Sequence, residues 1–408
     1  MSKYQSMKIL VAGGTGAVGR HICREVVRTL GPRALVVGDY NLDRGRDFSR
    51  SISESAGVAE LDVSDRRSVE RATEGVDAVI VAVRQLEPVV QAVCTERGIH
   101  SVDIVPDTPL ARSVFSPVHG DFRSAGGAGM NPLSGVVGAG LIPGLSGLMA
   151  RHMIEKTRAA GSNPTGPIVQ VSLLQRKNGT AGAAGIADML GLFARPLEYE
   201  GRRVPGFTLR RVTRFPPPFG DRTMRLVAFP EATDVRSHFG IEGVHYWTAF
   251  DNEPFNRTIG TLNRLGVLNR FRRPGGGARL ATFLARGKAR AVTRAVTREE
   301  TVALAAESGD FAVSLTAPSD YGGTAIAAVA MTRTLLARGI PDYGVVLPFQ
   351  LFSLAQIAGM ANSPEIRIYE AEPGDPGAGN EGPDSDGAAG ATRWIIRHGT
   401  RSVRKRES

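Results

Sequence analysis

The N-terminal part of the chain contains glycines at the spacing of a phosphate-binding turn. In the segment VAGGTGAVGR, the pattern G-x-G-x-x-G falls on Gly14, Gly16 and Gly19, and the related pattern G-x-x-G-x-x-G falls on Gly13, Gly16 and Gly19. One glycine lets the chain turn sharply after a strand, a second allows the backbone to touch a diphosphate, and a third lets the next helix pack closely. Because that helix would offer unpaired N–H groups and a positive dipole end, the predicted chemistry is dinucleotide binding. The alternative is a glycine-rich turn without a ligand.

An acidic residue stands at the distance that such a site requires. Asp39 ends the apolar run ALVVGD, about 20 residues after the glycines. A carboxylate there accepts hydrogen bonds from the ribose hydroxyls and repels a 2′-phosphate, so the sequence favours NAD(H). Arg44 lies just beyond and carries the charge to bind that phosphate, which leaves NADP(H) open as the cofactor.

The remaining cofactor contacts are predicted from where strands end, since the ligand crevice of such folds lies at the carboxyl ends of the strands. Asp62 follows a third apolar run and is expected beside the adenine, although it could instead be a helix cap, a role that Asp65 or Ser64 could also fill. The segment VAVRQLEP follows a fourth strand and should pass near the nicotinamide. The full predicted set is Gly13, Gly14, Thr15, Gly16, Ala17, Val18, Gly19, Asp39, Arg44, Asp62, Val63, Ala82 and Val83.

The elements that must position these residues alternate between strand and helix. Buried-strand patterns occur in KILVAG, ALVVGD, VAELDV, DAVIVAV and HSVDIV, and helical patterns separate them. Such βαβ units predict an α/β fold with a doubly wound parallel sheet of the Rossmann type. Later runs such as PIVQVSLLQ and FAVSLTA indicate a second, α+β domain.

Changes in composition suggest the domain boundaries. We expect a dinucleotide-binding domain over residues 1–125 and an α+β substrate or dimerisation domain over 126–340. A helix in 341–370 is expected to pack back on the first domain. The end of the chain, 371–408, is rich in Gly, Pro and acidic residues before a basic terminus, and its composition predicts disorder.

Bulk composition narrows the partners. The 408 residues carry a formal net charge of +10, which favours anionic partners such as a phosphorylated cofactor and an anionic small-molecule substrate. The two cysteines, Cys23 and Cys94, suggest buried thiols, with neither a disulfide framework nor a metal site. The N-terminus lacks a signal-peptide pattern, and no apolar run reaches the roughly 20 residues of a transmembrane helix. We therefore expect a cytoplasmic protein, and a homo-oligomer such as a dimer.

Several motifs resemble the saccharopine dehydrogenase-like oxidoreductases over about residues 7–370. The segment GVDAVIVAVRQLEPVVQAVCTERGIHSVDIV is similar to that family's strand, turn, Cys-containing helix and Y-x-D strand, and GAGLIPGLSGLMA, SDYGGTA and YGVVLPFQLF resemble its later segments. The resemblance implies a Rossmann domain with an inserted α+β domain, and hydride transfer at a carbon–nitrogen bond. This chain departs from the pattern where Ser101 replaces the tyrosine of Y-x-D and Arg84 stands in the turn after the fourth strand.

Four residues are candidates for the chemistry. Arg84 could clamp a substrate carboxylate, or be a surface arginine at a strand end. Asp103 could act as an acid or base, or cap a turn. Lys177 could face the cleft or lie at a solvated hairpin tip, and Tyr321 could donate a proton or simply follow a helix cap.

A long basic stretch, residues 257–298, carries no acidic residue. It could contact a peripheral anionic surface or form a solvated basic face, and it contains no clear nucleic-acid motif. Three functions remain open: an NAD(P)-dependent oxidoreductase acting on an imine or carbonyl of an anionic, amino-acid-like metabolite; a carbonyl or enoyl reductase acting on an acyl substrate; and a non-catalytic dinucleotide-binding sensor or scaffold.

Overall fold

The computed structural model describes residues 7–105, 134–161, 167–175, 189–272, 302–338, 344–371 and 394–398. The chain divides into two compact units. Unit 1 comprises Met1–Leu148 and Tyr321–Ser363, and unit 2 comprises Met149–Asp320 and Pro364–Ser408. The first unit therefore takes residues from both halves of the chain. The sequence suggested boundaries at 125 and 340, with a helix in 341–370 packing back on the first domain. Lys177 and most of the 257–298 stretch lie outside the described residues.

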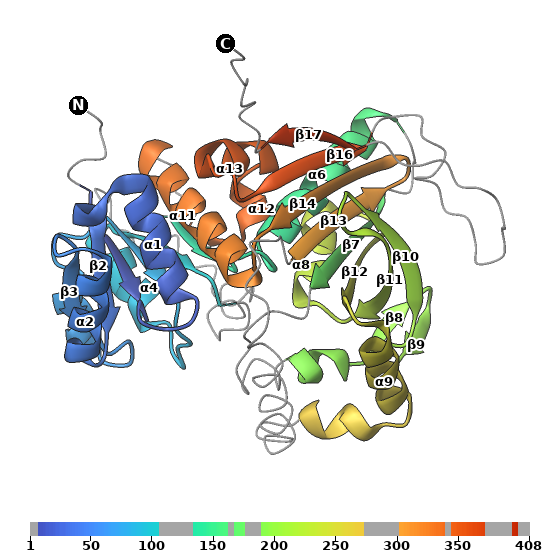
Figure 1. Ribbon diagram of the computed structural model, residues 1–408, viewed down its shortest axis with the longest axis horizontal. Helices are drawn as coiled ribbons and strands as arrows, with labels where there is room; N and C mark the ends of the chain where they lie inside the picture. The colour runs from blue at the N-terminus through green and yellow to red at the C-terminus, as the bar shows by residue number, and fades with distance from the viewer. Residues whose placement is uncertain are drawn as a thin grey trace, which may run out of the picture. The chain divides into compact units, whose positions relative to one another are not determined.

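Unit 1 is built on a parallel sheet, which confirms the predicted fold class (Figure 1). Every strand pair in it is parallel, and the spatial order is β15-β6-β5-β4-β1-β2-β3. The order of the chain reverses between β1 and β4, and ligands of such sheets bind outside the carboxyl ends of the strands at this point. The strands are β1 (Ile9–Ala12), β2 (Leu35–Asp39), β3 (Gly57–Glu60), β4 (Ala78–Val81), β5 (His100–Asp103), β6 (Ser134–Val137) and β15 (Gly344–Val346).

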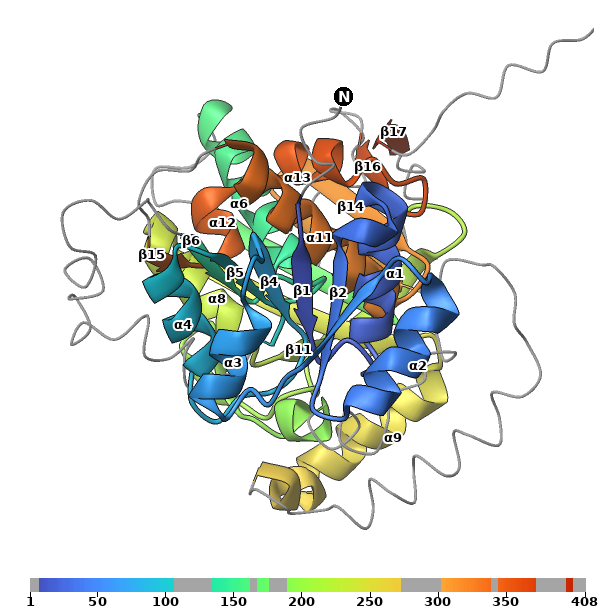
Figure 2. The same ribbon diagram turned by 90° about the vertical axis from the view of Figure 1, so that its left-hand side faces the viewer.

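Helices cover both faces of this sheet. From β1 the chain runs to β2 and β3, and it then crosses back to β4 and β5 on the other side of β1. Because these crossovers are right-handed, α1 and α2 lie on one face of the sheet and α3 and α4 on the opposite face (Figure 2). Val69 of α3 and Val90 of α4 pack with Leu10 and Val79 of the sheet in one apolar cluster. The helices are α1 (Gly19–Leu30), α2 (Leu42–Ile52), α3 (Arg66–Ala72) and α4 (Val89–Arg97), and a short 3-10 turn, η1 (Pro32–Ala34), precedes β2.

The later part of unit 1 is helical. It contains α11 (Asp320–Arg338), whose first residue belongs to unit 2, and the short helices α12 (Pro348–Leu351) and α13 (Leu354–Ala361). Arg28 of α1 donates to the carbonyl of Ala361 at 3.3 Å, and Arg333 of α11 donates to the carbonyl of Met360 at 2.7 Å. These bonds fasten the end of α13 to helices that come from distant parts of the sequence.

Unit 2 contains a mixed sheet of eight strands in the order β10-β11-β12-β7-β13-β14-β16-β17, in agreement with the predicted α+β class. Only β12 and β7 pair in parallel there. The sheet is strongly curved, because the hydroxyls of Ser172 on β7 and Thr213 on β10 lie 2.9 Å apart although two strands separate β7 from β10.

The strands of unit 2 are β7 (Ile168–Gln175), β10 (Arg210–Phe215), β11 (Gly220–Val227), β12 (Gly243–Phe250), β13 (Val302–Ser308), β14 (Phe311–Ala317), β16 (Arg367–Ala371) and β17 (Trp394–His398), with a separate hairpin of β8 (Leu197–Tyr199) and β9 (Arg202–Val204). Its helices are α8 (Pro230–Phe239), α9 (Glu253–Arg264) and η3 (Val267–Arg272), and α6 (Leu145–Ala159) enters it from the end of unit 1.

One strand lies within the segment for which composition predicted disorder. β17 pairs with β16, and the guanidinium of Arg397 lies 3.0 Å from the carboxylate of Glu370. His152 and Lys156 of α6 contact the same carboxylate at 2.9 and 3.0 Å. Local composition missed this strand because its partners lie elsewhere in the chain. Among the described residues, no helix is both long enough and apolar enough to cross a membrane.

Candidate functional site

The glycine loop between β1 and α1 has the geometry that its spacing predicts. The N–H groups of Gly13 and Gly14 both donate to the carbonyl of Gly38 at 3.0 Å, and Gly13 has a φ of +77°. A Cβ on Gly19 would lie 2.1 Å from the carbonyl oxygen of Gly13, so only glycine allows the helix to begin so close to the strand. Gly16 is exposed, and a Cβ there would meet only the same oxygen, at 3.1 Å. The loop thus has a packed base and an open tip.

The open tip leads into a helix start suited to an anion. α1 has no side-chain cap at Val18 and no acidic residue in its first turn. Arg20 of α1 donates from Nε to the carbonyl of Thr15 in the loop at 2.7 Å. An exposed, uncapped helix N-terminus presents N–H donors and the positive end of the helix dipole. The residues present therefore fit a diphosphate.

Asp39 lies beside this loop, at the end of β2. The hydroxyl of Thr15 donates to Oδ2, while the N–H of Asn41 and the guanidinium of Arg44 donate to Oδ1 at 2.9 and 2.6 Å. Burial by itself raises the pKa of Asp39, but these hydrogen bonds outweigh it and leave the pKa below its usual value. Asp39 is thus an ionised, oriented acceptor next to the diphosphate position, as a ribose-binding carboxylate must be.

Arg44 combines two contacts at the same place. Besides its bond to Asp39, its guanidinium lies 4.8 Å from the ring centre of Tyr40, whose side chain is 69% exposed. The side chain of Arg44 is itself 43% exposed. A guanidinium held at this edge neutralises part of the charge of Asp39 and can meet a phosphate on the ribose.

Asp62 and Val63 follow β3 at the same edge of the sheet. The exposed Asp62 accepts bonds from the N–H and hydroxyl of Ser64, which lower its pKa. The cap of α3 is Asp65, which accepts from the N–H groups of Arg67 and Ser68. Asp62 was expected either to contact the adenine or to cap a helix. Asp65 is the helix cap, which the sequence had allowed.

Ala82 and Val83 bring the end of β4 against the glycine loop. Ala82 donates its N–H to the carbonyl of Ala12 at 2.9 Å, and a Cβ on Gly13 would lie 2.9 Å from the Cβ of Val83. The chain leaving β4 therefore borders the loop where the order of the sheet reverses. The next side chains, Arg84 and Leu86, are exposed, and Leu86 is 87% accessible.

Asp103 ends β5 with its side chain fully buried. Gln91 donates to its Oδ2 at 2.8 Å, and the N–H of Val105 donates to its Oδ1 at 2.8 Å. Burial raises the pKa of Asp103 to about 7, against the lowering effect of these two bonds. Gln91 in turn accepts from Gln85, so a polar chain runs beneath the loop after β4. Sequence reasoning missed both glutamines, whose only signal is an amide in an otherwise apolar stretch.

Tyr321 lies near the start of α1. Its ring centre is 6.1 Å from that of His21, in the first turn of that helix. The structure thus brings Tyr321 to the helix that begins at the glycine loop, whereas Arg84 follows β4 and Asp103 is the last residue of β5. Lys177 lies outside the described residues, and those residues contain no group of His, Cys, Asp and Glu able to hold a metal ion.

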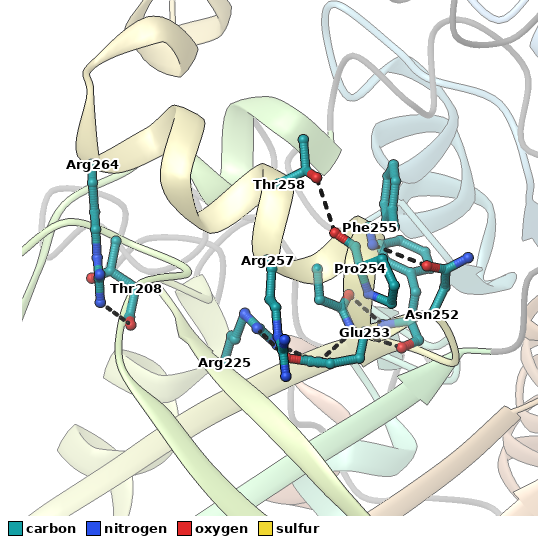
Figure 3. A network of polar contacts seen from close by, with 11 residues as sticks. Thr208, Arg225, Asn252, Glu253, Pro254, Phe255, Arg257, Thr258 and Arg264 are labelled. Atoms are coloured by element: carbon teal, nitrogen blue, oxygen red, sulfur yellow. Dashed lines mark hydrogen bonds and ion pairs between the residues drawn. The ribbon is translucent and has the colours of Figure 1, made fainter.

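The first arginines of the basic stretch bind within unit 2 (Figure 3). Arg257 of α9 lies 3.2 Å from Glu253, which also receives two bonds from the buried Arg225 of β11, and Arg264 donates to the carbonyl of Thr208 at 3.4 Å. The bonds of Arg225 to Glu253 join α9 to the sheet, and the pair of Arg257 with Glu253 lies within the helix. The arginines from Arg273 onward lie outside the described residues.

Comparisons with known proteins agree with this architecture. A family model described as the 3-beta hydroxysteroid dehydrogenase/isomerase family matches residues 10–105, and curated proteins give no match. Among solved structures, apo saccharopine dehydrogenase (L-Glu forming) from Saccharomyces cerevisiae is similar over 87% of this chain and 96% of its own, with 13% identity and a TM-score of 0.60. This chain has the saccharopine dehydrogenase fold.

A second structure supports the same assignment. Homospermidine synthase from Legionella pneumophila, solved in complex with NAD, is similar over 88% of this chain and 89% of its own, with 11% identity and a TM-score of 0.52. The resemblance noted in the sequence is thus confirmed in the fold. In the saccharopine dehydrogenase fold of this chain, the parallel sheet carries the glycine loop, Asp39 and the segment after β4.

Proposed function

We propose that this chain is an NAD(P)-dependent oxidoreductase. The observation that carries the proposal is the pairing of an open, uncapped glycine loop with Asp39, whose carboxylate is ionised and oriented by Thr15, Asn41 and Arg44. The complex of the similar homospermidine synthase with NAD supports a dinucleotide. Gly13 to Gly19 would hold the diphosphate, Asp39 the adenosine ribose, and Asp62 and Val63 the adenine side.

The geometry suggests a division of labour among the chain's residues. When bound, the nicotinamide supplies or accepts the hydride. Ala82 and Val83 form the floor beside which that ring would lie, because their chain borders Gly13 at the reversal of strand order. Arg84 would hold a substrate carboxylate, and its planar guanidinium suits two parallel hydrogen bonds. Tyr321 stays a candidate proton donor and Lys177 a candidate cleft residue.

The substrate that we favour is an imine or carbonyl of an anionic, amino-acid-like metabolite. The similar saccharopine dehydrogenase is described as forming L-Glu, which supports this class. The second candidate is a carbonyl or enoyl reductase acting on an acyl substrate, which the match of residues 10–105 to a hydroxysteroid dehydrogenase family favours. That match covers the first five strands of unit 1 and no part of unit 2, so we rank this candidate function second.

Calorimetry with NADH and NADPH tests the proposal first. Saturable heat with at least one of them is expected, and no heat with any nicotinamide dinucleotide, reduced or oxidised, would overturn it. The absorbance of the reduced nicotinamide is then followed with amino acids plus oxo acids or aldehydes, and separately with acyl thioesters. Turnover with the first panel supports the favoured substrate, and turnover with thioesters alone supports the second candidate. Binding without any turnover would identify a dinucleotide-binding sensor or scaffold.

Two further expectations accompany this proposal. A homo-oligomer and a cytoplasmic location stay predictions, and sedimentation and cell fractionation measure them. For the basic stretch, a solvated face is the favoured interpretation, and vesicle co-sedimentation would test the alternative of contact with an anionic surface.

A further inference from the structure

A row of buried polar side chains lies beneath the segment that follows β4. Gln85, Gln91 and Asp103 are 4%, 3% and 0% exposed. The N–H of Val90 donates to Oε1 of Gln85 at 3.2 Å, Nε2 of Gln85 donates to Oε1 of Gln91 at 3.0 Å, and Nε2 of Gln91 donates to Oδ2 of Asp103 at 2.8 Å. Every donor therefore points along the row toward the same carboxylate.

A row of buried polar side chains is less favourable for stability than apolar side chains that fill the same space. Gln91 lies in α4 beside Val90, Val93 and Cys94, which belong to an apolar cluster. Burying amides and a carboxyl group is unfavourable unless each polar atom is paired, and apolar side chains of similar size would fill the same space without that condition. Because the side-chain oxygen and nitrogen atoms of these three residues are hydrogen-bonded, we infer that the row holds a neighbouring part of the backbone in one conformation.

The geometry that it fixes is that of residues 82–88. Gln85 lies in the middle of this segment and points inward, while its neighbours Arg84 and Leu86 are exposed. At one end Val83 touches the glycine loop, and at the other end α4 begins. The direction of the Gln85 amide therefore determines how Arg84 and Leu86 are presented at the carboxyl edge of the sheet.

We propose that Gln85, Gln91 and Asp103 are positioning residues that hold the 82–88 segment in place, and that the ionised carboxylate of Asp103 orients both amides. Any effect of this segment on a cofactor or substrate rests on the proposed function. The coupling between Asp103 and the segment is independent of the proposed function.

Protonation of Asp103 disturbs the row. A neutral carboxyl group carries an O–H that needs an acceptor, yet the groups facing it, Nε2 of Gln91 and the N–H of Val105, are both donors. Turning the Gln91 amide to supply its oxygen places two nitrogens together at Gln85, so the change passes along the row. Among the residues that the structure describes, burial and these two bonds account for the raised pKa of Asp103. We therefore expect the segment to change its arrangement when Asp103 gains a proton.

A fluorescent label at position 86 tests this coupling in the full chain. Cys23 and Cys94 are buried and burial raises their thiol pKa values to about 12, so an environment-sensitive maleimide dye reacts selectively with the Leu86→Cys variant. We expect its emission to change between pH 5.5 and 8.5 with a midpoint near 7. The same dye on Val212→Cys, an exposed site in unit 2, is the control and should show no such transition.

Two second-site variants decide the origin of the transition. Asp103→Asn keeps the shape but cannot titrate, and Gln91→Leu cuts the row while leaving the carboxyl group; either should abolish the transition at position 86. A transition that survives Asp103→Asn would overturn the proposal, since another group would then be its source. A signal in the parent that does not change with pH would overturn it as well. Circular dichroism checks that each variant is folded. If Gln91→Leu does not fold, the near-isosteric Asp103→Asn variant alone decides the test.

Calorimetry on the unlabelled parent with NADH, NADPH and their oxidised forms separates this proposal from the proposed function. A transition at position 86 without binding of any nicotinamide dinucleotide to the parent supports the positioning row and overturns the oxidoreductase. Dinucleotide binding without a transition at position 86 supports the oxidoreductase and overturns the positioning row.

Discussion

At the scale of single residues, the glycine loop and Asp39 carry the nucleotide-binding proposal. Replacing Asp39 by Ala removes a charged acceptor for the ribose, and hydrogen bonds to charged groups contribute about 1.5–3 kcal/mol. We expect the Kd for NADH to rise by about 10-fold or more. Asp43→Ala is the matched control, because Asp43 is 89% exposed and lies four residues further along, in α2. Equal affinity of the Asp39 variant and the parent, by titration calorimetry, would refute the ribose assignment.

Arg44 should govern the choice between the two nicotinamide dinucleotides. Its guanidinium is positioned by Asp39 and Tyr40 at the edge where a 2′-phosphate would lie. Arg44→Ala is expected to weaken NADPH binding by about 10-fold while changing NADH binding less, because a phosphate loses a charged partner and a hydroxyl does not. Arg46→Ala, with an exposed side chain paired to Asp43, provides the control. A parallel loss for both cofactors would contradict this role.

Gly19 tests the close approach of α1 to β1. A methyl group there would overlap the carbonyl of Gly13, so Gly19→Ala should cost about 1–3 kcal/mol of stability or more and abolish NADH binding. Gly359 of α13 has open space around its Cβ position, and Gly359→Ala should stabilise the protein by about 0.5–1 kcal/mol. Urea unfolding of both variants checks the contrast, which would fail if the two substitutions behaved alike.

At the scale of elements, α9 illustrates how a buried amide holds a helix in unit 2. Nδ2 of Asn263 donates to the carbonyls of Phe193 and Gly206, which flank the β8–β9 hairpin. Asn263→Ala leaves these two buried acceptors without a donor, so we expect a loss of about 1–3 kcal/mol in urea unfolding. The exposed Asn269 supplies the control substitution, for which no comparable loss is expected. Affinity for NADH should stay unchanged, since the glycine loop belongs to unit 1.

At the scale of the whole molecule, two carboxyl groups give opposite pH dependences. The folded-state pKa of Glu370 is lowered to about 2 by His152 and Lys156, so its contribution to stability is complete above the unfolded pKa of about 4.3 and is lost as pH falls toward 2. Asp103 has a folded-state pKa raised to about 7, so it favours the folded state at low pH and destabilises it as pH rises from about 3.9 to 7.

Melting temperatures of two variants measure these opposite slopes. The deficit of Glu370→Gln relative to the parent should be full at pH 6 and shrink toward pH 3. Asp103→Asn should improve relative to the parent between pH 4 and pH 7, because the variant has no carboxyl group to ionise. Differences that do not vary with pH would show that neither group titrates as described.

The sequence alone was sufficient for the parallel sheet, the glycine loop and Asp39, because these depend on local signals. Apolar runs, helix lengths and glycine spacing encode βαβ units within short windows, and the acidic residue follows at a fixed distance. It also anticipated that Asp65 could cap α3, since capping is a local hydrogen bond.

Only the tertiary structure decided which distant residues meet. It brought α11 from Tyr321 onward into the unit of the parallel sheet, paired β17 with β16, and placed Tyr321 beside His21. It also joined Gln85 and Gln91 to Asp103 and gave Arg44 its bond to Asp39. These contacts depend on where a side chain points after the chain has folded and on how deeply it is buried. Neither property has a period or a spacing in the sequence, and the pKa values that follow from burial are therefore properties of the folded molecule.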